Sequence, residues 1–242
     1  MTVRQAAGCT ISATRMGLLL ALAGFATLSM GDGLVKSTAG QWPGPAVAAL
    51  RYVIGTSALG MIILFFRGPQ GFRVSRLDIQ LGRGLAVGLA TLCFFLGVQL
   101  MPLADVTAIQ FTSPVFVALL APLLLGERAP RITWLTTAIA LTGVAIVLRP
   151  NVMALGLAAL LPVTAALGMA FLVILNRRMA GLSDVLALQF WGAIFATPLL
   201  LIAAAAGHFS GAPQMQVAMP DAAIILTCAA LAFTGTVAHW LI

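Results

Sequence analysis

The sequence predicts an all-α fold, a polytopic membrane helical bundle, and three observations support this prediction. Of the 242 residues, 61% are hydrophobic and only 8% are charged, whereas soluble domains carry about 25% charged residues. The apolar residues form runs long enough to cross a bilayer. The net charge of +7 comes largely from basic residues that gather between these runs, which indicates membrane orientation and not nucleic-acid binding.

Eight runs qualify as membrane spans, because a helix needs about 20 residues to cross the hydrocarbon core. The connections between the runs are short, so neighbouring helices should be antiparallel and no soluble domain is expected. The expected spans are 16–38, 44–66, 82–101, 104–125, 132–149, 153–175, 184–206 and 221–242.

Residues 1–15 precede the first span and have some features of a secretory signal. Arg4 and Arg15 stand before a 14-residue apolar stretch, Gly17–Met30, and "STA" at 37–39 resembles a cleavage site. Removal is disfavoured because the first helix of a multi-span protein needs no cleavage and this one carries charges. We expect 1–15 to be a cytoplasmic tail.

The distribution of Lys and Arg predicts the orientation of the chain. Ten of the thirteen basic residues flank connections on one side of the membrane, whereas Arg149 alone flanks the other side. Basic residues accumulate on the cytoplasmic side, so the N-terminus is expected in the cytoplasm, with the chain in the cell membrane, the inner membrane of a bacterium. The ten are Arg4, Arg15, Arg67, Arg73, Arg76, Arg83, Arg128, Arg131, Arg177 and Arg178.

An internal repeat runs through the chain with an offset of about 139 residues. "AALRYVIG" from residue 48 aligns with "LALQFWGA" from 186, and "FFLGVQLMP" from 94 meets "AFTGTVAHWLI" from 232. The first copy, 16–149, has five spans, so the second copy, 153–242, starts on the opposite side and the repeats are inverted. The second copy has three spans and ends on "VAHWLI" without a polar flank, so we expect it to be incomplete.

Several motifs resemble the EamA-type transporters of the drug/metabolite transporter superfamily. They are "TSPVF" at 112–116, "LLGER" at 124–128 and "ALTGVAIVLRP" at 140–150, together with a Lys near the end of the first helix and "LRY" in the second. The resemblance implies a ten-helix fold of two inverted five-helix repeats that moves small organic solutes by alternating access. Substrates differ widely within such families, so it implies no particular solute.

Three charged residues are expected near one end of the first two spans. Asp32 and Lys36 are four residues apart and share a helix face, and Arg51 lies at about the depth of Asp32, about 10 Å below the boundary. Charge facing lipid costs at least about 2.5 kcal/mol, so the group should face the bundle interior. Either Asp32 neutralises Arg51 while Lys36 reaches the interface, or the group binds a carboxylate or phosphate or exchanges a proton.

Amide and aromatic side chains inside the spans could line a solute pocket. A buried amide needs partners, and an apolar wall with a few polar groups is typical of a small-molecule site. Hydrogen bonding between helices is the alternative for each amide, and simple packing is the alternative for the histidine. The candidates are Phe95, Gln99, Gln110, Gln189, His239 and Trp240.

Gating residues are expected where helices bend or end. Pro114 removes a backbone hydrogen bond within the fourth span and so predicts a kink, which is either static or part of a gate. Glu127 lies at the cytoplasmic end of the same span, and Arg131 could pair with it across the turn. This pair predicts a structural clamp at the end of the repeat, and a part in the inner gate is the alternative.

The sequence favours a secondary transporter for a small organic metabolite, with export as the expected direction. Uptake of a vitamin- or nucleoside-like metabolite and a non-transporting membrane fragment or subunit are the alternatives. No H-E-x-x-H motif or nucleophile elbow occurs, so no enzyme, metal or cofactor is expected. The expected partners are the solute and the lipid bilayer. Proton coupling through Asp32 or His239 and a homodimer are options.

Overall fold

The fold is known from a computed structural model, which describes residues 3–126, 131–148, 156–182, 184–210 and 215–241. Every regular element in these ranges is a helix. The elements are α1 (Val3–Thr38), α2 (Gly44–Arg67), η1 (Pro69–Phe72), α3 (Leu77–Leu100), α4 (Leu103–Gln110), α5 (Ser113–Leu125), α6 (Arg131–Leu148), η2 (Gly156–Ala159), α8 (Leu160–Met179), α9 (Val185–Phe209) and α10 (Ala222–Leu241).

The predicted all-α membrane bundle is confirmed. Five segments are long and apolar enough to cross a membrane, and shorter apolar helices cover Ile132–Gly143 and Ala222–Ala238. The five are Gly44–Arg67, Leu77–Leu100, Leu103–Leu125, Gly156–Met179 and Val185–Phe209.

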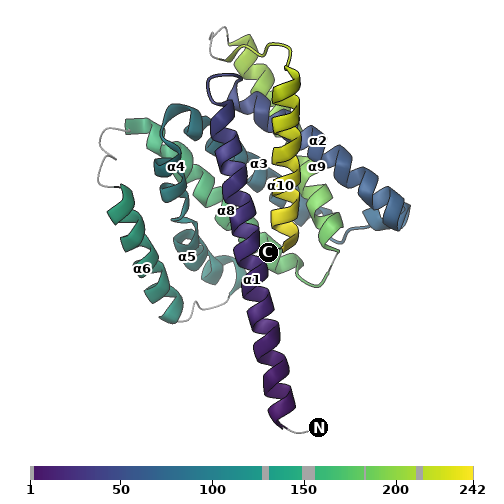
Figure 1. The fold of residues 1–242 in the computed structure, drawn as a ribbon, viewed down its shortest axis with the longest axis vertical. Helices are drawn as coiled ribbons and strands as arrows, with labels where there is room; N and C mark the ends of the chain where they lie inside the picture. Colours follow the sequence, from purple (N-terminus) through teal and green to yellow (C-terminus); the bar gives the residue numbers. More distant parts are fainter. Residues whose placement is uncertain (1–2, 127–130, 149–155, 183, 211–214, 242) are drawn as a thin grey trace.

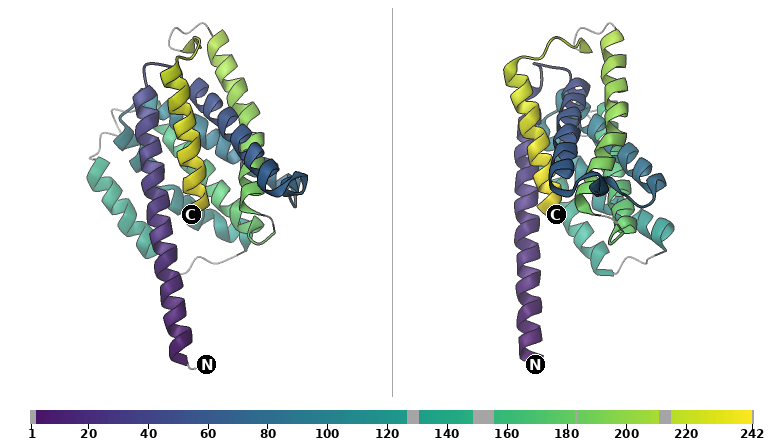
Figure 2. Two further views of the ribbon diagram at one scale, coloured as in Figure 1. Left: turned by 45° about the vertical axis from the view of Figure 1, so that its right-hand side comes forward. Right: turned by 90° about the vertical axis from the view of Figure 1, so that its right-hand side faces the viewer.

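The helices pack around α3, which lies at the centre of the bundle (Figure 1). α3 contacts both α8 and α9, α2 contacts α9 and α10, and α1 runs beside α10 in the opposite direction (Figure 2). α5 packs on α8, and α6 lies at the edge of the bundle. The N-terminal part of α1 projects beyond the other helices, so the segment expected as a tail continues the first span as helix.

Close packing of α3 depends on small residues. A side chain at Gly84 would come 3.0 Å from the carbonyl oxygen of Gly192 in α9, and one at Gly88 would come 3.3 Å from Ala196. On the α8 side, a side chain at Gly168 would come 2.9 Å from the carbonyl oxygen of Ala86. These glycines let the helix backbones approach closely, as small residues do in membrane helices.

The fourth predicted span is divided into α4 and α5. Pro114 stands in the first turn of α5 and has no N–H to donate to the carbonyl of Gln110. Just before it, the Thr112 N–H donates to the Ile109 oxygen at 3.0 Å, a tighter i−3 bond that ends the α-helical pattern. The proline therefore interrupts the helix, where the sequence predicted a kink in one continuous span.

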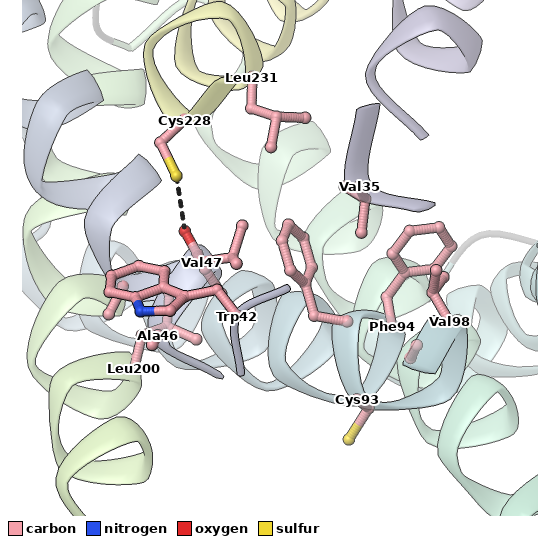
Figure 3. Close-up of a cluster of buried hydrophobic side chains, with 14 of the residues drawn as sticks. Val35, Trp42, Ala46, Val47, Cys93, Phe94, Val98, Leu200, Cys228 and Leu231 are labelled. Carbon is pink, nitrogen blue, oxygen red and sulfur yellow. Dashed lines mark hydrogen bonds between the residues drawn. The ribbon is translucent and has the colours of Figure 1, made fainter. Parts of the chain in front are cut away.

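The apolar core lies at the end of the bundle where α1 turns into α2 (Figure 3). Trp42 is buried there, and its indole N–H donates to the Ala218 carbonyl at 3.1 Å. Val47, Phe94 and Leu231 bring α2, α3 and α10 into the same cluster. Burial of these side chains fixes α2, α3 and α10 relative to one another.

The opposite end of the bundle, which holds the α2–α3 connection and the α8–α9 turn, is called the basic end here. It carries Arg67, Arg73, Arg76, Arg177 and Arg178. Arg67 pairs with Asp184 at 2.5 Å, and the Trp191 indole donates to the Phe72 carbonyl at 2.8 Å. These bonds tie the connection to the start of α9.

Candidate functional site

Two adjoining cavities lie inside the bundle. The Asp32 cavity has a volume of about 100 Å³ and is bounded by α1, α2, α3, α4, α8 and α10. The Arg83 cavity, of about 80 Å³, is bounded by α2, α3, α8, α9 and α10 and lies nearer the basic end. The two cavities share four lining residues, Arg51, Tyr52, Val87 and Gly235.

Arg51 stands at the boundary between the two cavities. Its guanidinium lies 5.6 Å from the ring centre of Tyr52 and 5.8 Å from that of Phe95, so both rings contribute cation–π attraction. The Tyr52 hydroxyl is within hydrogen-bond distance of the Thr91 hydroxyl, at 3.1 Å. The aromatic rings hold the charge inside the bundle and leave it facing both cavities.

Asp32 and Arg51 line the same cavity, as the sequence predicted, but they are not in contact. Among the described residues no ion pair within 4.0 Å includes Asp32. The carboxylate is half-buried on α1, across the cavity from α3. Its negative charge therefore faces the cavity and not a cation in direct contact.

Lys36 lies apart from this pair, which corrects the expected group of three charges. Its ammonium group donates to the carbonyl oxygens of Val98 at 2.9 Å and Met101 at 3.3 Å. These are carbonyls at the C-terminal end of α3, where a cation is favoured by the helix dipole. Lys36 thus fastens α1 to the end of α3 and lines neither cavity.

The three predicted amides lie in three different places. Gln99 donates to the Trp42 carbonyl at 3.0 Å and lines neither cavity, so the inter-helix alternative holds for it. Gln110 lines the Asp32 cavity, and its side-chain oxygen is buried without a hydrogen-bond partner. Gln189 lines the Arg83 cavity.

The other predicted residues are only partly placed. Phe95 lines the Asp32 cavity, and Pro114 marks the break between α4 and α5. The helix α10 includes His239 and Trp240, but their side chains lie outside the described residues, as does the side chain of Arg131. Glu127 also lies outside them, so its pairing with Arg131 stays a prediction.

Arg83 is a site residue that the sequence prediction missed. It was assigned to the connection before the third span, but α3 begins at Leu77 and places Arg83 in the second turn of the helix. The residue is only 4% exposed and lines the Arg83 cavity. The signal that could have located it is Gln80, three residues earlier and therefore on the same helix face.

The Arg83 guanidinium is held by three hydrogen bonds. Nε donates to the side-chain oxygen of Asn176 in α8 at 2.6 Å. Nη1 donates to the side-chain oxygen of Gln80 at 2.5 Å and to the Leu188 carbonyl at 3.0 Å. All three acceptors are neutral groups, so the positive charge is oriented but not neutralised.

The site offers no metal-binding chemistry within the described ranges. No group of three or more His, Cys, Asp or Glu side chains that could hold a metal ion occurs there. The two cavities are lined by one carboxylate, two guanidinium groups, amides, hydroxyls and aromatic rings. Such a lining can bind a small polar organic molecule.

Comparisons with known proteins all point to one transporter family. A family model described as the EamA-like transporter family matches residues 15–149. The pseudopaline exporter CntI of Pseudomonas aeruginosa is 30% identical over 138 residues, 56% of this chain and 47% of the relative. An S-adenosylmethionine uptake transporter of Rickettsia bellii is 26% identical over 163 residues, 67% of this chain and 55% of the relative. A riboflavin transporter of Rhizobium johnstonii is 32% identical over 120 residues, 50% of this chain and 40% of the relative.

The chain spans about half the length of the curated relatives it matches. No solved structure matches it. The family match covers more than half of the chain and includes all three motifs on which the sequence resemblance rested, apart from the last residue of the third. This chain therefore belongs to the EamA-like transporter family.

Proposed function

We propose that this chain forms the solute-binding core of a secondary transporter that moves a small organic metabolite by alternating access. The observation that carries the proposal is the pair of adjoining cavities with Arg51 and Tyr52 between them. Each cavity lies toward a different end of the bundle. A solute could then reach the same central residues from either side in turn.

The helix packing supports an inverted-repeat relationship between 16–149 and 153–242. Exchanging α1 with α8, α2 with α9 and α3 with α10 converts the α1–α10 pair into α8–α3, and converts α2–α10 into α9–α3. The α2–α9 pair is converted into itself. This is the pattern that two inverted halves about a pseudo-two-fold axis between α2 and α9 would produce, and rocking of one half against the other would alternate access.

The bonds at the basic end fit a closed gate in this proposal. Besides the Arg67–Asp184 ion pair and the Trp191–Phe72 hydrogen bond, the Ser75 hydroxyl donates to the Leu182 carbonyl at 3.2 Å. Opening the Arg83 cavity to this side would separate the α2–α3 connection from the α8–α9 turn. The positive charge of this end favours its placement in the cytoplasm.

Counterflow in proteoliposomes tests the proposal. The full chain, and a longer reading frame where one exists, would be reconstituted into proteoliposomes. The vesicles would be loaded with unlabelled solute, and a trace of labelled solute would be added outside, with a panel of amino acids, vitamins and nucleoside-like cations. We expect transient accumulation of at least one compound and its loss in Asp32→Asn and Arg51→Ala. Absence of counterflow for every compound with the longer frame would contradict the proposal.

Direction requires its own measurement, because the named relatives include an exporter and uptake transporters. We propose export for this chain, with uptake of a vitamin- or nucleoside-like metabolite as the alternative. Cells that express the gene should retain less of the preloaded solute than cells that express Arg51→Ala. Faster accumulation from the medium would instead support uptake.

A further inference from the structure

We infer that the Arg83 cavity contains an oxyanion site, in which the guanidinium of Arg83 binds a carboxylate or phosphate group, with Arg51 as the second cation. The inference rests on the proposed function only in taking the anion to be part of the transported solute. The binding site itself follows from hydrogen bonding and charge in the cavity.

The hydrogen-bond donors of Arg83 are only partly used. A guanidinium has five N–H donors in one plane, and the bonds to Asn176, Gln80 and Leu188 use Nε–H and both N–H groups of Nη1. The Nη2 group has no protein acceptor within the part of the chain that the structure describes, and the residue lines the cavity. Because three bonds fix the plane of the fork, its free edge is preoriented for an oxygen ligand.

The charge of the cavity points to an anion. Arg51 and Arg83 line it, and no Asp or Glu does so. Of the five acids in the described ranges, Asp184 and Asp78 pair with Arg67 and Arg76 at the basic end, and Asp32 lines the other cavity. Asp105 and Asp221 line neither cavity. Arg51 has the Asp32 carboxylate across the other cavity, but Arg83 is bonded only to neutral groups. A buried cation without a counter-charge is unfavourable in a low-dielectric interior, so a bound anion would supply the charge that Arg83 lacks.

The remaining lining suits a small polar ligand. Thr56 and Tyr52 contribute hydroxyl groups, and Gln189 contributes an amide that can either donate or accept. Leu59 and Leu172 provide apolar surface for the rest of the ligand. The cavity therefore matches an organic anion whose charged group contacts Arg83.

Thermal unfolding of the full chain in detergent tests the site without requiring transport. Succinate and inorganic phosphate would be titrated separately against chloride of equal ionic strength and against the neutral analogue succinamide. We expect succinate or phosphate to raise the Tm, with a half-maximal concentration at least about tenfold higher in Arg83→Gln and Arg83→Lys. If succinate raises the Tm the site binds a carboxylate, and if phosphate raises it the site binds a phosphate.

Arg177→Gln is the matched control, because this arginine is exposed near the basic end and lines neither cavity. It should respond to anions as the wild type does. If Arg83→Gln does not fold, Arg83→Lys and Asn176→Ala test the site instead. Arg83→Lys keeps the charge without the planar guanidinium, and Asn176→Ala removes one of the hydrogen bonds that orient the guanidinium. A wild-type Tm that responds equally to chloride and both anions, or variants with the wild-type response, would overturn the site.

The outcome separates this inference from the proposed transport. If counterflow fails for every solute but the anion-dependent rise in Tm depends on Arg83, the binding site stands and the transporter proposal falls. If counterflow succeeds while the Arg83 variants bind and move anions as the wild type does, the site falls and the transporter proposal stands.

Discussion

The guanidinium of Arg51 occupies the space beside Gly235 that any larger residue would need. A Cβ atom at Gly235 would lie 2.8 Å from Nη2 of Arg51, closer than a van der Waals contact allows. The missing side chain on α10 is thus what lets a charged residue of α2 stand between the two cavities. The position of Arg51 is set by two helices far apart in the sequence.

Gly235→Val should displace Arg51 from the boundary between the cavities. The clashing atoms are the far end of a flexible side chain and can move aside, so the cost in unfolding free energy should lie near the low end of about 1–3 kcal/mol. Counterflow should therefore fall by more than the Tm would explain. Gly143→Ala in α6 is the control, since a Cβ there meets nothing within 4 Å, and it should leave both measurements near the wild-type values. Unchanged counterflow in Gly235→Val would show that the position of Arg51 does not matter.

Lys36→Met should reduce stability and leave solute affinity unchanged. The substitution leaves the Val98 and Met101 carbonyls without their donor, at an expected cost of about 1–2 kcal/mol in unfolding free energy. Lys36→Arg should recover most of the loss because it keeps the charge. Thermal unfolding and the KM for counterflow provide the two readouts, and a raised KM with an unchanged Tm would return Lys36 to the binding site.

Loss of the amide should lower stability at Gln99 but not at Gln110. Gln99→Ala removes the bond to the Trp42 carbonyl and should lower the free energy of unfolding by about 1–2 kcal/mol. Gln110→Met removes a buried oxygen that has no partner, so stability should be unchanged or higher. Denaturation midpoints of the two variants, measured side by side, check this; destabilisation of the same size in both would contradict it.

The Arg67–Asp184 pair should make stability depend on pH at acidic values. Partial burial acts to raise the pKa of the Asp184 carboxyl, but the hydrogen bond from Arg67 and its charge outweigh this and hold the pKa below the ordinary value of 3.8. A lowered pKa means that the stabilisation is complete above the pKa of the unfolded chain and is lost as pH falls through the folded value. The side chains are 46% and 38% exposed, so the effect should not exceed about 1 kcal/mol.

Asp184→Asn isolates this charge effect. Asp184 also caps α9 by accepting a bond from the Leu186 N–H at 3.2 Å, and Asn caps helices equally well. The Tm difference between the wild type and the variant should be constant near neutral pH and shrink toward zero below about pH 4. A difference that persists at the lowest pH would assign the stability to the cap and not to the ion pair.

The sequence predicted the all-α membrane bundle correctly because long apolar runs have few alternatives to a spanning helix. Of the eight predicted spans, five match segments long and apolar enough to cross a membrane in the described ranges, and two match shorter apolar helices. It misplaced Arg83 because a basic residue near the start of an apolar run looks like part of a connection. In the structure α3 starts at Leu77, and Asn176 and Leu188 of neighbouring elements supply the acceptors that make burial of Arg83 tolerable. Those partners are about a hundred residues away, so no local pattern could reveal them.

The error over Lys36 has a different cause. The spacing of four residues correctly places Asp32 and Lys36 on one face of α1, but it does not say which neighbouring group a long side chain reaches. Lys36 extends to the end of α3, whereas the shorter Asp32 remains at the cavity. Gln99 shows the same limit, because its partner is a backbone carbonyl in the α1–α2 connection, to which sequence pattern gives no guide.

The guanidinium of Arg51 borders both cavities, and this sharing limits how many solute molecules the two cavities can hold at once. A molecule that binds Arg51 from one cavity uses N–H donors that a second molecule in the other cavity would need. Under the transport proposal, one solute molecule should be carried in each conformational cycle. Solute added at the far face should then act as a competitive inhibitor of loading and not as a co-substrate.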